Sequence, residues 1–519
     1  MSAETGHDLD AVDSGTGSAL HHSVHPRRHR NLLASPFLRL PTELVLKIFV
    51  RAIEIESENN RLVPLVLTAI CHKFREIGVT SSKLWGTVDL VTPPIAELFL
   101  ERCNYDPQTL KRSPTASENK LECLVGDPGR TALWEKLKGC KFNGLRSIVF
   151  EGTKYELDVR VAGILRRAPN LSNLEIYNIQ PGPELPSPIS SSLPNLSTLR
   201  VRGFWVSWTS PLLRNLTQLV LDFSSPNLPL EPTSIGMFLT ALAKCPNLEI
   251  LILIHVGPDS LNGHQDNCNT VVQLCRLQDL RLEFSDPRMV GYILSHIEYP
   301  ESTQLAVKVT AEIHDDLPEA ISLVFPYRNV QTSQHFCKSK AITIHLGNNR
   351  FQFSTGNLRI SFEESRRNFA HREHLGVLAQ VASKIVEVVG GDTTASLRLE
   401  AIAIVPPDGM WEVLLRGLPR LEQICYGLIR MKGDKEFVDP FVFVFSRPCG
   451  GEPVCPWLQH LELSKVVVTQ DTSAVLLERA LVGRDVCDRR LKRLGLCGDA
   501  TEDDWLVLEP FRRLVDKIR

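Results

Sequence analysis

The sequence of 519 residues predicts an α/β fold that joins a compact helical segment to a longer array of strands and helices. Two observations support this prediction. Apolar residues recur at helical spacing between residues 35 and 90. Beyond residue 100 a short apolar motif recurs, often behind a helical segment. We therefore expect a tail over residues 1–34, a helical domain over residues 35–90 and a repeat domain over residues 91–519.

The composition is typical of a folded intracellular protein. Hydrophobic residues make up 43%, charged residues make up 23%, and the formal net charge is −2, so we expect neither nucleic acid nor a membrane surface as a partner. Thirteen cysteines occur without a Cys-x-x-Cys pair or an apolar leader, which indicates reduced thiols. No apolar run reaches the roughly 18–20 residues that span a bilayer. We expect the protein in the cytoplasm, the nucleus or both.

The tail and the helical domain differ sharply in pattern. Residues 1–34 are rich in Ser, Gly, His and Asp and lack apolar periodicity, which predicts disorder. From Pro36, apolar residues at helical spacing predict a first helix, with Pro41 in its first turn and Glu43 near its positive end. A polar break over 54–60 precedes a second helical segment, which ends near "GVTSSKLW" (78–85). "GTVDLV" (86–91) predicts a short strand.

The stretches "LRLPTELVLKIF" and "LTAICHKFREIGVTSSKLWGTVDL" resemble an F-box of the kind common in basidiomycete fungi. The pattern is Leu-Pro-x-Glu before an apolar helix, then a Cys-containing helix with an aromatic-Arg pair, then Leu-Trp after a small polar turn. Phe74 stands where the family usually has Trp, and the polar break lengthens a loop. The matching positions are Leu40, Pro41, Glu43, Leu44, Ile48, Phe49, Cys71, Phe74, Arg75, Leu84 and Trp85.

The resemblance implies a small trihelical unit whose Leu-Pro edge binds a Skp-type adaptor protein and, through it, a cullin. Physically, a domain this small exposes apolar side chains that it cannot bury internally. Phe74 and Trp85 are expected in its core. The alternative is that the exposed apolar residues pack only against the chain's own repeat domain. The expected adaptor-binding residues are Leu40, Pro41, Glu43, Leu44 and Ile48.

A motif of the form Leu-x-x-Leu-x-Leu recurs in the rest of the chain. The first six copies start 20 to 32 residues apart, close to the period of about 20–29 residues that leucine-rich repeats show. Pro-Asn or Pro-Arg precedes several copies. The copies start at Leu145, Leu171, Leu196, Leu216, Leu248, Leu277, Leu421, Leu458 and Leu491.

Such a pattern predicts a degenerate leucine-rich-repeat solenoid, with parallel strands on one side and helices on the other. The leucines point inward and stack on the next repeat, while the side chains between them face outward on the concave strand face. We expect this face to bind a target protein, with Arg200, Arg202 and Arg281 as unranked candidates. Between residues 300 and 400 the motif fades, leaving strands at 306–313, 341–347 and 396–404 and a helix at 374–389.

The sequence contains no recognisable catalytic, cofactor-binding or metal-binding constellation. Phosphate-binding glycine loops and a nucleophile elbow are absent. His371 and His374 lie three residues apart, but a zinc site needs further ligands nearby. Cys425, Cys455 and Cys497 fall on or beside repeat strands, where cysteine usually acts as a small buried apolar residue. We therefore expect no enzyme, no cofactor and no metal.

The resemblance implies the substrate-recognition subunit of a Skp–cullin–F-box E3 ubiquitin ligase, which holds a target protein near the ubiquitin-charged enzyme. Two alternatives remain open on the sequence. One is an F-box and leucine-rich-repeat scaffold that binds its adaptor outside any ligase. The other, less favoured, is an enzyme with an unrecognised site within residues 300–400.

Overall fold

The structure is a computed structural model of the chain, which divides into two compact units. The first unit comprises Met1–Phe150 and Gly163–Leu171, and the second comprises Glu151–Ala162 and Ser172–Arg519. The residues that the structure describes are 35–56, 63–85, 87–89, 98, 119–124, 145–153, 162–178, 185, 193–223, 235–257, 270–310, 317–324, 340–347, 350–363, 375–389, 393–402, 404–429, 440–448, 452–464, 471–497 and 509–518.

The first unit begins with short helices and continues into strands. Its helical part contains η1 (Pro36–Arg39), α2 (Thr42–Glu56), α3 (Val63–Ile70), α4 (His72–Thr80) and η2 (Ser82–Trp85). The elements that follow along the chain are β1 (Thr87–Asp89), β2 (Asn119–Leu124), β3 (Leu145–Gly152) and, at the division between the units, α8 (Ala162–Leu165). β1 and β2 pair in parallel.

The helices of the first unit differ from the sequence prediction in two details. The predicted second helical segment is two helices, α3 and α4, because Cys71 has extended backbone and its Sγ accepts the Phe74 amide at 3.4 Å. Pro41 lies just before α2 rather than in its first turn, and its carbonyl accepts the amides of Leu44 and Val45. Pro41 therefore supplies the first acceptor of the helix, where its missing N–H has no cost.

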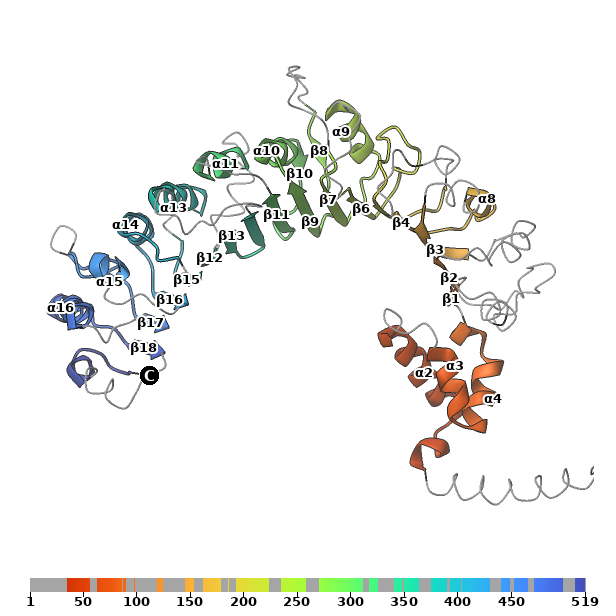
Figure 1. The fold of residues 1–519 in the computed structure, drawn as a ribbon, viewed down its shortest axis with the longest axis horizontal. Coiled ribbons are helices and arrows are strands. Elements are labelled where there is room, and N and C mark those ends of the chain that lie inside the picture. Colours follow the sequence, from red (N-terminus) through yellow and green to blue (C-terminus); the bar gives the residue numbers. More distant parts are fainter. Residues whose placement is uncertain are drawn as a thin grey trace, which may run out of the picture. The chain divides into compact units, whose positions relative to one another are not determined.

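The second unit is a mixed α/β structure built on a large, mostly parallel sheet (Figure 1). Its strands are β4 (Asn173–Asn178), β5 (Thr198–Arg202), β6 (Gln218–Asp222), β7 (Ile250–Ile254), β8 (Val272–Gln273), β9 (Asp279–Phe284), β10 (Ile297–Glu298), β11 (Gln304–Thr310), β12 (Ala341–Gly347), β13 (Arg350–Thr355), β14 (Leu358–Glu363), β15 (Ser396–Ile402), β16 (Gln423–Ile429), β17 (His460–Ser464) and β18 (Arg493–Cys497). Its helices are α9 (Ile235–Ala243), α10 (Pro287–Ser295), α11 (Leu317–Val324), α13 (Leu375–Val389), α14 (Asp408–Gly417), α15 (Pro440–Phe445), α16 (Asp471–Val486) and η6 (Glu509–Arg513).

The strands follow one another across the sheet nearly in chain order. From β4 the order is β4-β5-β6-β7-β9-β11-β14-β13-β12-β15-β16-β17-β18, and β8 pairs separately with β10. Helices α9 to α16 lie along one side of this sheet (Figure 1). The exception to parallel pairing is the hairpin of β13 and β14, which are antiparallel to each other, as are β12 and β13. The all-parallel array predicted from the repeats is therefore wrong at this point.

Alternation along each strand places the recurring leucines in the core. In β5, Leu199 and Val201 are buried, whereas Thr198, Arg200 and Arg202 occupy the positions between and beside them. Because side chains alternate between the two faces of a strand, these latter residues form the opposite surface, which we call the strand face. The leucines of neighbouring strands are in register, so each motif stacks on the next.

The predicted elements between residues 300 and 400 are present with shifted ends. The strands expected at 306–313, 341–347 and 396–404 are β11, β12 and β15, and the helix expected at 374–389 is α13. Their core positions are filled by side chains such as Ile344, Leu399 and Ile385. Within the described ranges, none of the helices combines the length and the apolar character needed to cross a membrane.

Candidate functional site

Helix α2 is apolar on two faces. Val45 and Phe49 are 0% and 1% exposed and form the core of the first unit. Leu44 and Ile48, one helical turn apart, are 45% and 41% exposed. A helix that serves only an internal core carries a single apolar stripe. The outer pair therefore leaves much of its apolar surface uncovered in this unit.

The Leu-Pro segment is held in place by a lysine on another helix. Lys73 on α4 donates from Nζ to the carbonyls of Leu38 and Leu40, at 2.7 and 2.9 Å. These bonds link α4 to the chain just ahead of α2. Leu40 is half-buried, whereas Pro41 and Glu43 are exposed. The five residues predicted to bind the adaptor thus lie together in sequence at the start of α2, and Leu40 contributes the least surface.

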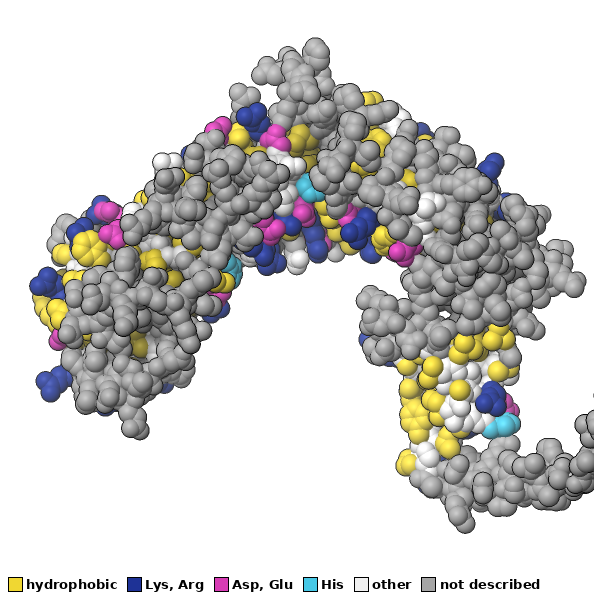
Figure 2. Space-filling model, in the orientation of Figure 1, with side chains coloured by type: hydrophobic (Ala, Val, Ile, Leu, Met, Phe, Trp, Pro, Cys, Tyr) yellow, Lys and Arg dark blue, Asp and Glu magenta, His cyan; other side chains and the backbone are white. Residues whose placement is uncertain are grey.

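Other apolar side chains of the first unit are also exposed, and hydrophobic atoms gather over its visible face (Figure 2). On α3, Val66 and Ile70 are one turn apart and are 53% and 59% exposed. Phe37 and Val79 are exposed as well. Exposed apolar groups at this density are of the kind that mark interaction surfaces.

Phe74 and Trp85 lie in the core of the first unit, as predicted. Phe74 is 5% exposed and packs edge-to-face against Phe37 and Phe49, with ring centroids 5.5 and 5.0 Å away. Trp85 is 2% exposed and donates from Nε1 to the Gly78 carbonyl at 2.7 Å. Phe74 is therefore accommodated within the apolar core.

The three arginines proposed from sequence all lie on the strand face of the second unit. Arg200 on β5 and Arg281 on β9 share one row, separated by Val220 and Ile252 on the strands between them. Both apolar residues are half-exposed. The row therefore places an apolar pair between two cations, an arrangement that the spacing of residues in the sequence does not reveal.

The arginines differ in their partners. Arg202 Nε lies 3.3 Å from an Asp222 oxygen, across neighbouring strands, and Arg281 pairs with Asp279 on its own strand at 2.9 Å. Near Arg200, the Tyr177 hydroxyl donates to Glu175 at 2.8 Å. Burial, followed by this bond, raises the pKa of Tyr177 to about 12, so the hydroxyl stays protonated as a donor.

Ion pairs continue across the middle of the strand face. Lys308 Nζ lies 2.9 Å from Glu283 and 3.1 Å from Glu363, which also approaches Arg350 at 3.5 Å. Burial lowers the pKa of Lys308, but the hydrogen bonds and charges of Glu283 and Glu363 together outweigh burial, so the pKa lies above its ordinary value. Figure 2 shows cationic and anionic side chains interspersed along the visible strand face. This mixture makes the central face polar but close to neutral.

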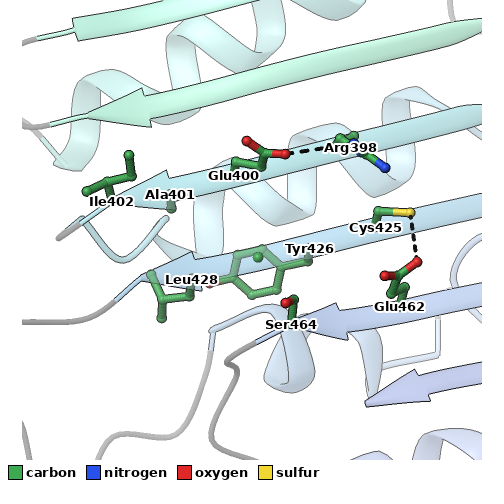
Figure 3. A pocket seen from close by; sticks show the side chains of 10 residues that line it. Arg398, Glu400, Ala401, Ile402, Cys425, Tyr426, Leu428, Glu462 and Ser464 are labelled. Carbon is green, nitrogen blue, oxygen red and sulfur yellow. Dashed lines mark hydrogen bonds and ion pairs between the residues drawn. The ribbon is translucent and has the colours of Figure 1, made fainter. Parts of the chain in front are cut away.

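A pocket that the sequence did not indicate lies nearer the C-terminal end of the strand face (Figure 3). Its volume is about 280 Å³, and its lining comes from β15, β16 and β17. The Cys425 thiol donates to Glu462 at 3.7 Å, and burial raises the pKa of that thiol. Cys425 is buried, as predicted, but its sulfur faces a carboxylate rather than an apolar core. The lining residues are Arg398, Glu400, Ala401, Ile402, Cys425, Tyr426, Gly427, Leu428, Glu462 and Ser464.

The remaining predicted groups are either structural or undescribed. Cys455 is 2% exposed, and its thiol donates to the Leu415 carbonyl at 3.3 Å. His371, His374 and the basic cluster of the tail lie outside the described residues. Across the described part of the chain, no group of three or more His, Cys, Asp or Glu side chains could hold a metal ion.

Comparison with known proteins adds no relative to these observations. No family model matches the chain, and no curated protein matches it in sequence.

Proposed function

We propose that this protein is the substrate-recognition subunit of a Skp–cullin–F-box E3 ubiquitin ligase. An F-box over residues 35–90 binds a Skp-type adaptor, and a degenerate leucine-rich-repeat solenoid over residues 91–519 binds a target protein. The observation that carries the proposal is the second apolar face of α2. Val45 and Phe49 pack this helix into the core, while Leu44 and Ile48 remain exposed on its other side.

The energetics favour a protein partner on this face. Complete burial of a Leu or Ile side chain contributes about 1.5–3 kcal/mol. Leu44 and Ile48 retain much of that free energy for association because each is more than 40% exposed. Lys47 and Arg51 occupy the same helical face and are exposed, so acidic groups on the adaptor would complement its rim.

The second unit supports the recognition half of the proposal. Its register aligns outward side chains from many strands into rows, as in Arg200, Val220, Ile252 and Arg281. A surface built from many repeats can contact a large target, and the side chains of each row set the charge and polarity of the part of the surface they form. The chain would contribute proximity and no covalent step, because it raises the effective concentration of a target lysine near the ubiquitin thioester.

Co-purification with a Skp-type adaptor tests the proposal. Wild-type chain should form a stoichiometric complex, whereas Leu44→Asp combined with Ile48→Asp should weaken it at least about thirtyfold, since buried interface anchors contribute about 2 kcal/mol or more. Both substitutions are at exposed positions, so the fold should persist by circular dichroism. Affinity is measured by isothermal titration calorimetry.

Val482→Asp provides a matched control. Val482 on α16 is 43% exposed, as much as the two α2 residues, but belongs to the second unit. Adaptor binding should be unchanged in this variant. If wild-type chain does not bind the adaptor, the proposal fails. An adaptor complex that never recruits a cullin would instead favour the scaffold function.

A further inference from the structure

The pocket on the strand face is open because a glycine occupies its centre. In one row, Gly427 on β16 lies between Glu400 on β15 and Ser464 on β17. A Cβ placed on Gly427 would find its nearest neighbour, the Ser464 Cβ, 3.8 Å away. Position 427 therefore accepts a side chain without a clash, and the missing side chain leaves a hollow on the strand face.

The charges around the hollow are unbalanced. Glu400 lies 3.0 Å from His345 and 3.9 Å from Arg398, so its charge is partly matched. Glu462 is half-buried and accepts a bond from the Cys425 thiol, a weak donor. Among the described residues, Glu462 has no ion-pair partner. A half-buried carboxylate with so weak a donor gains free energy from a cation placed beside it.

The volume of the pocket and the apolar side chain of Ile402 indicate which kind of group the pocket can bind. Its volume of about 280 Å³ is below the range of roughly 300–1,000 Å³ typical of pockets that enclose drug-sized ligands. Ile402 lines it with a side chain that is 49% exposed. Ile402 lies at one end of the pocket and Glu462 at the other (Figure 3). An apolar end and a carboxylate end fit a side chain with an aliphatic stem and a charged end, which is the structure of lysine and arginine.

We propose that this pocket binds one lysine or arginine side chain of the target protein, with the stem over Gly427, between Ile402 and Glu462, and the cation beside Glu462. The inference deepens the proposed function, since it assigns a residue class to the target. An acidic side chain would meet two carboxylates, Glu400 and Glu462, against the one arginine of the lining, Arg398. A purely apolar side chain would leave Glu462 desolvated without compensation.

Methyl NMR of the full chain provides the test. The protein is labelled with ¹³C at isoleucine δ1 methyl groups, and the Ile402 signal is assigned with an Ile402→Val variant. N-acetyl-lysine amide and N-acetyl-arginine amide are titrated separately. N-acetyl-norleucine amide, which has an aliphatic stem without the charge, is the matched probe. At least one cationic amide should shift the Ile402 methyl saturably, and norleucine amide should not.

Variants of the protein test whether the cationic amides bind in this pocket. Glu462→Gln should weaken binding of the cationic amide about tenfold, because a charge-assisted hydrogen bond becomes a neutral one. Gly427→Val should abolish the shift by filling the hollow. Glu283→Gln, which removes a strand-face carboxylate that is paired with Lys308, should bind as wild type does.

Three results would overturn the inference: no shift with either cationic amide, an equal shift with norleucine amide, or wild-type affinity in Glu462→Gln. The titration uses no adaptor, and Glu462→Gln should retain adaptor binding. A failure of this inference is therefore distinguishable from a failure of the proposed function, which adaptor co-purification reads independently.

Discussion

At the scale of single residues, the most unusual group is Arg484 on α16, a guanidinium that is 1% exposed. It donates to the carbonyls of Val454, Cys455 and Leu458 at 2.9, 3.1 and 2.9 Å. Burial lowers its pKa to about 10, so it remains charged at neutral pH. The side chain bonds carbonyls in the turn before β17; of these, the Cys455 carbonyl also accepts the Leu458 amide, whereas the Val454 and Leu458 carbonyls depend on Arg484 among the described residues.

Replacing this arginine should be costly. Arg484→Met keeps most of the apolar stem but removes the side-chain donor of the Val454 and Leu458 carbonyls, while the Cys455 carbonyl keeps the Leu458 amide. We therefore expect a loss of about 3 kcal/mol in the free energy of unfolding of the second unit. Arg479→Met on the exposed side of the same helix is the control and should change it by less than about 0.5 kcal/mol. Urea denaturation measures both. Equal losses would show that Arg484 acts only as a spacer.

At the scale of elements, close helix packing depends on a glycine at the end of α14. A Cβ at Gly417 would lie 2.6 and 2.8 Å from the two γ-carbons of Val386 on α13. Neighbouring helices approach here more closely than any other residue would allow. By contrast, Gly483 on α16 has no atom within 4 Å of its would-be Cβ.

The two glycines should respond oppositely to alanine. Gly417→Ala should push α14 away from α13 and reduce the thermal stability of the second unit by about 1–3 kcal/mol, as overpacking usually does. Gly483→Ala should raise it by up to about 1 kcal/mol, since alanine is the better helix former. Calorimetry of the two variants measures both changes in stability. Stabilisation by both substitutions would contradict the described α13–α14 packing.

The hairpin of β13 and β14 has a turn signal that can be recognised in the sequence. Thr355 pairs with Leu358, so Gly356 and Asn357 form a two-residue turn, and Gly356 has a φ of 51°. Gly-Asn between two alternating apolar runs is a recognised hairpin signal.

Helix α16, by contrast, has no usable sequence signal, because exposed Val475 and Val482 alternate with buried Leu477 and Leu481 around the helix. Its apolar residues therefore do not mark one face.

At the scale of the whole molecule, the sheet of the second unit joins each strand only to its neighbours. Stability in such an array is approximately a sum of repeat and nearest-neighbour contributions. The consequences of a core substitution should therefore stay local. β6 pairs with β5 and β7, and its Leu219 is 1% exposed.

Hydrogen exchange should reveal this locality. Leu219→Ala, with an expected loss of about 2–5 kcal/mol, should reduce amide protection in β5, β6 and β7 but leave β17 and β18 unchanged. Leu461→Ala on β17 is the reciprocal control and should affect β16 to β18 instead. Uniform loss of protection across all strands in either variant would indicate a single cooperative sheet.

The sequence by itself determined the strands that carry the recurring motif, the buried leucines and the apolar character of α2, because these follow from local periodicity. It also placed Leu44 and Ile48 through their motif. It did not predict β13 and β14, which interrupt the parallel order. Only the tertiary structure decided which outward residues share a surface. Arg398, Cys425 and Glu462 come from three separate strands and meet because strand register aligns them. Register depends on packing between distant segments, so the pocket over Gly427 could be recognised only once those strands were paired.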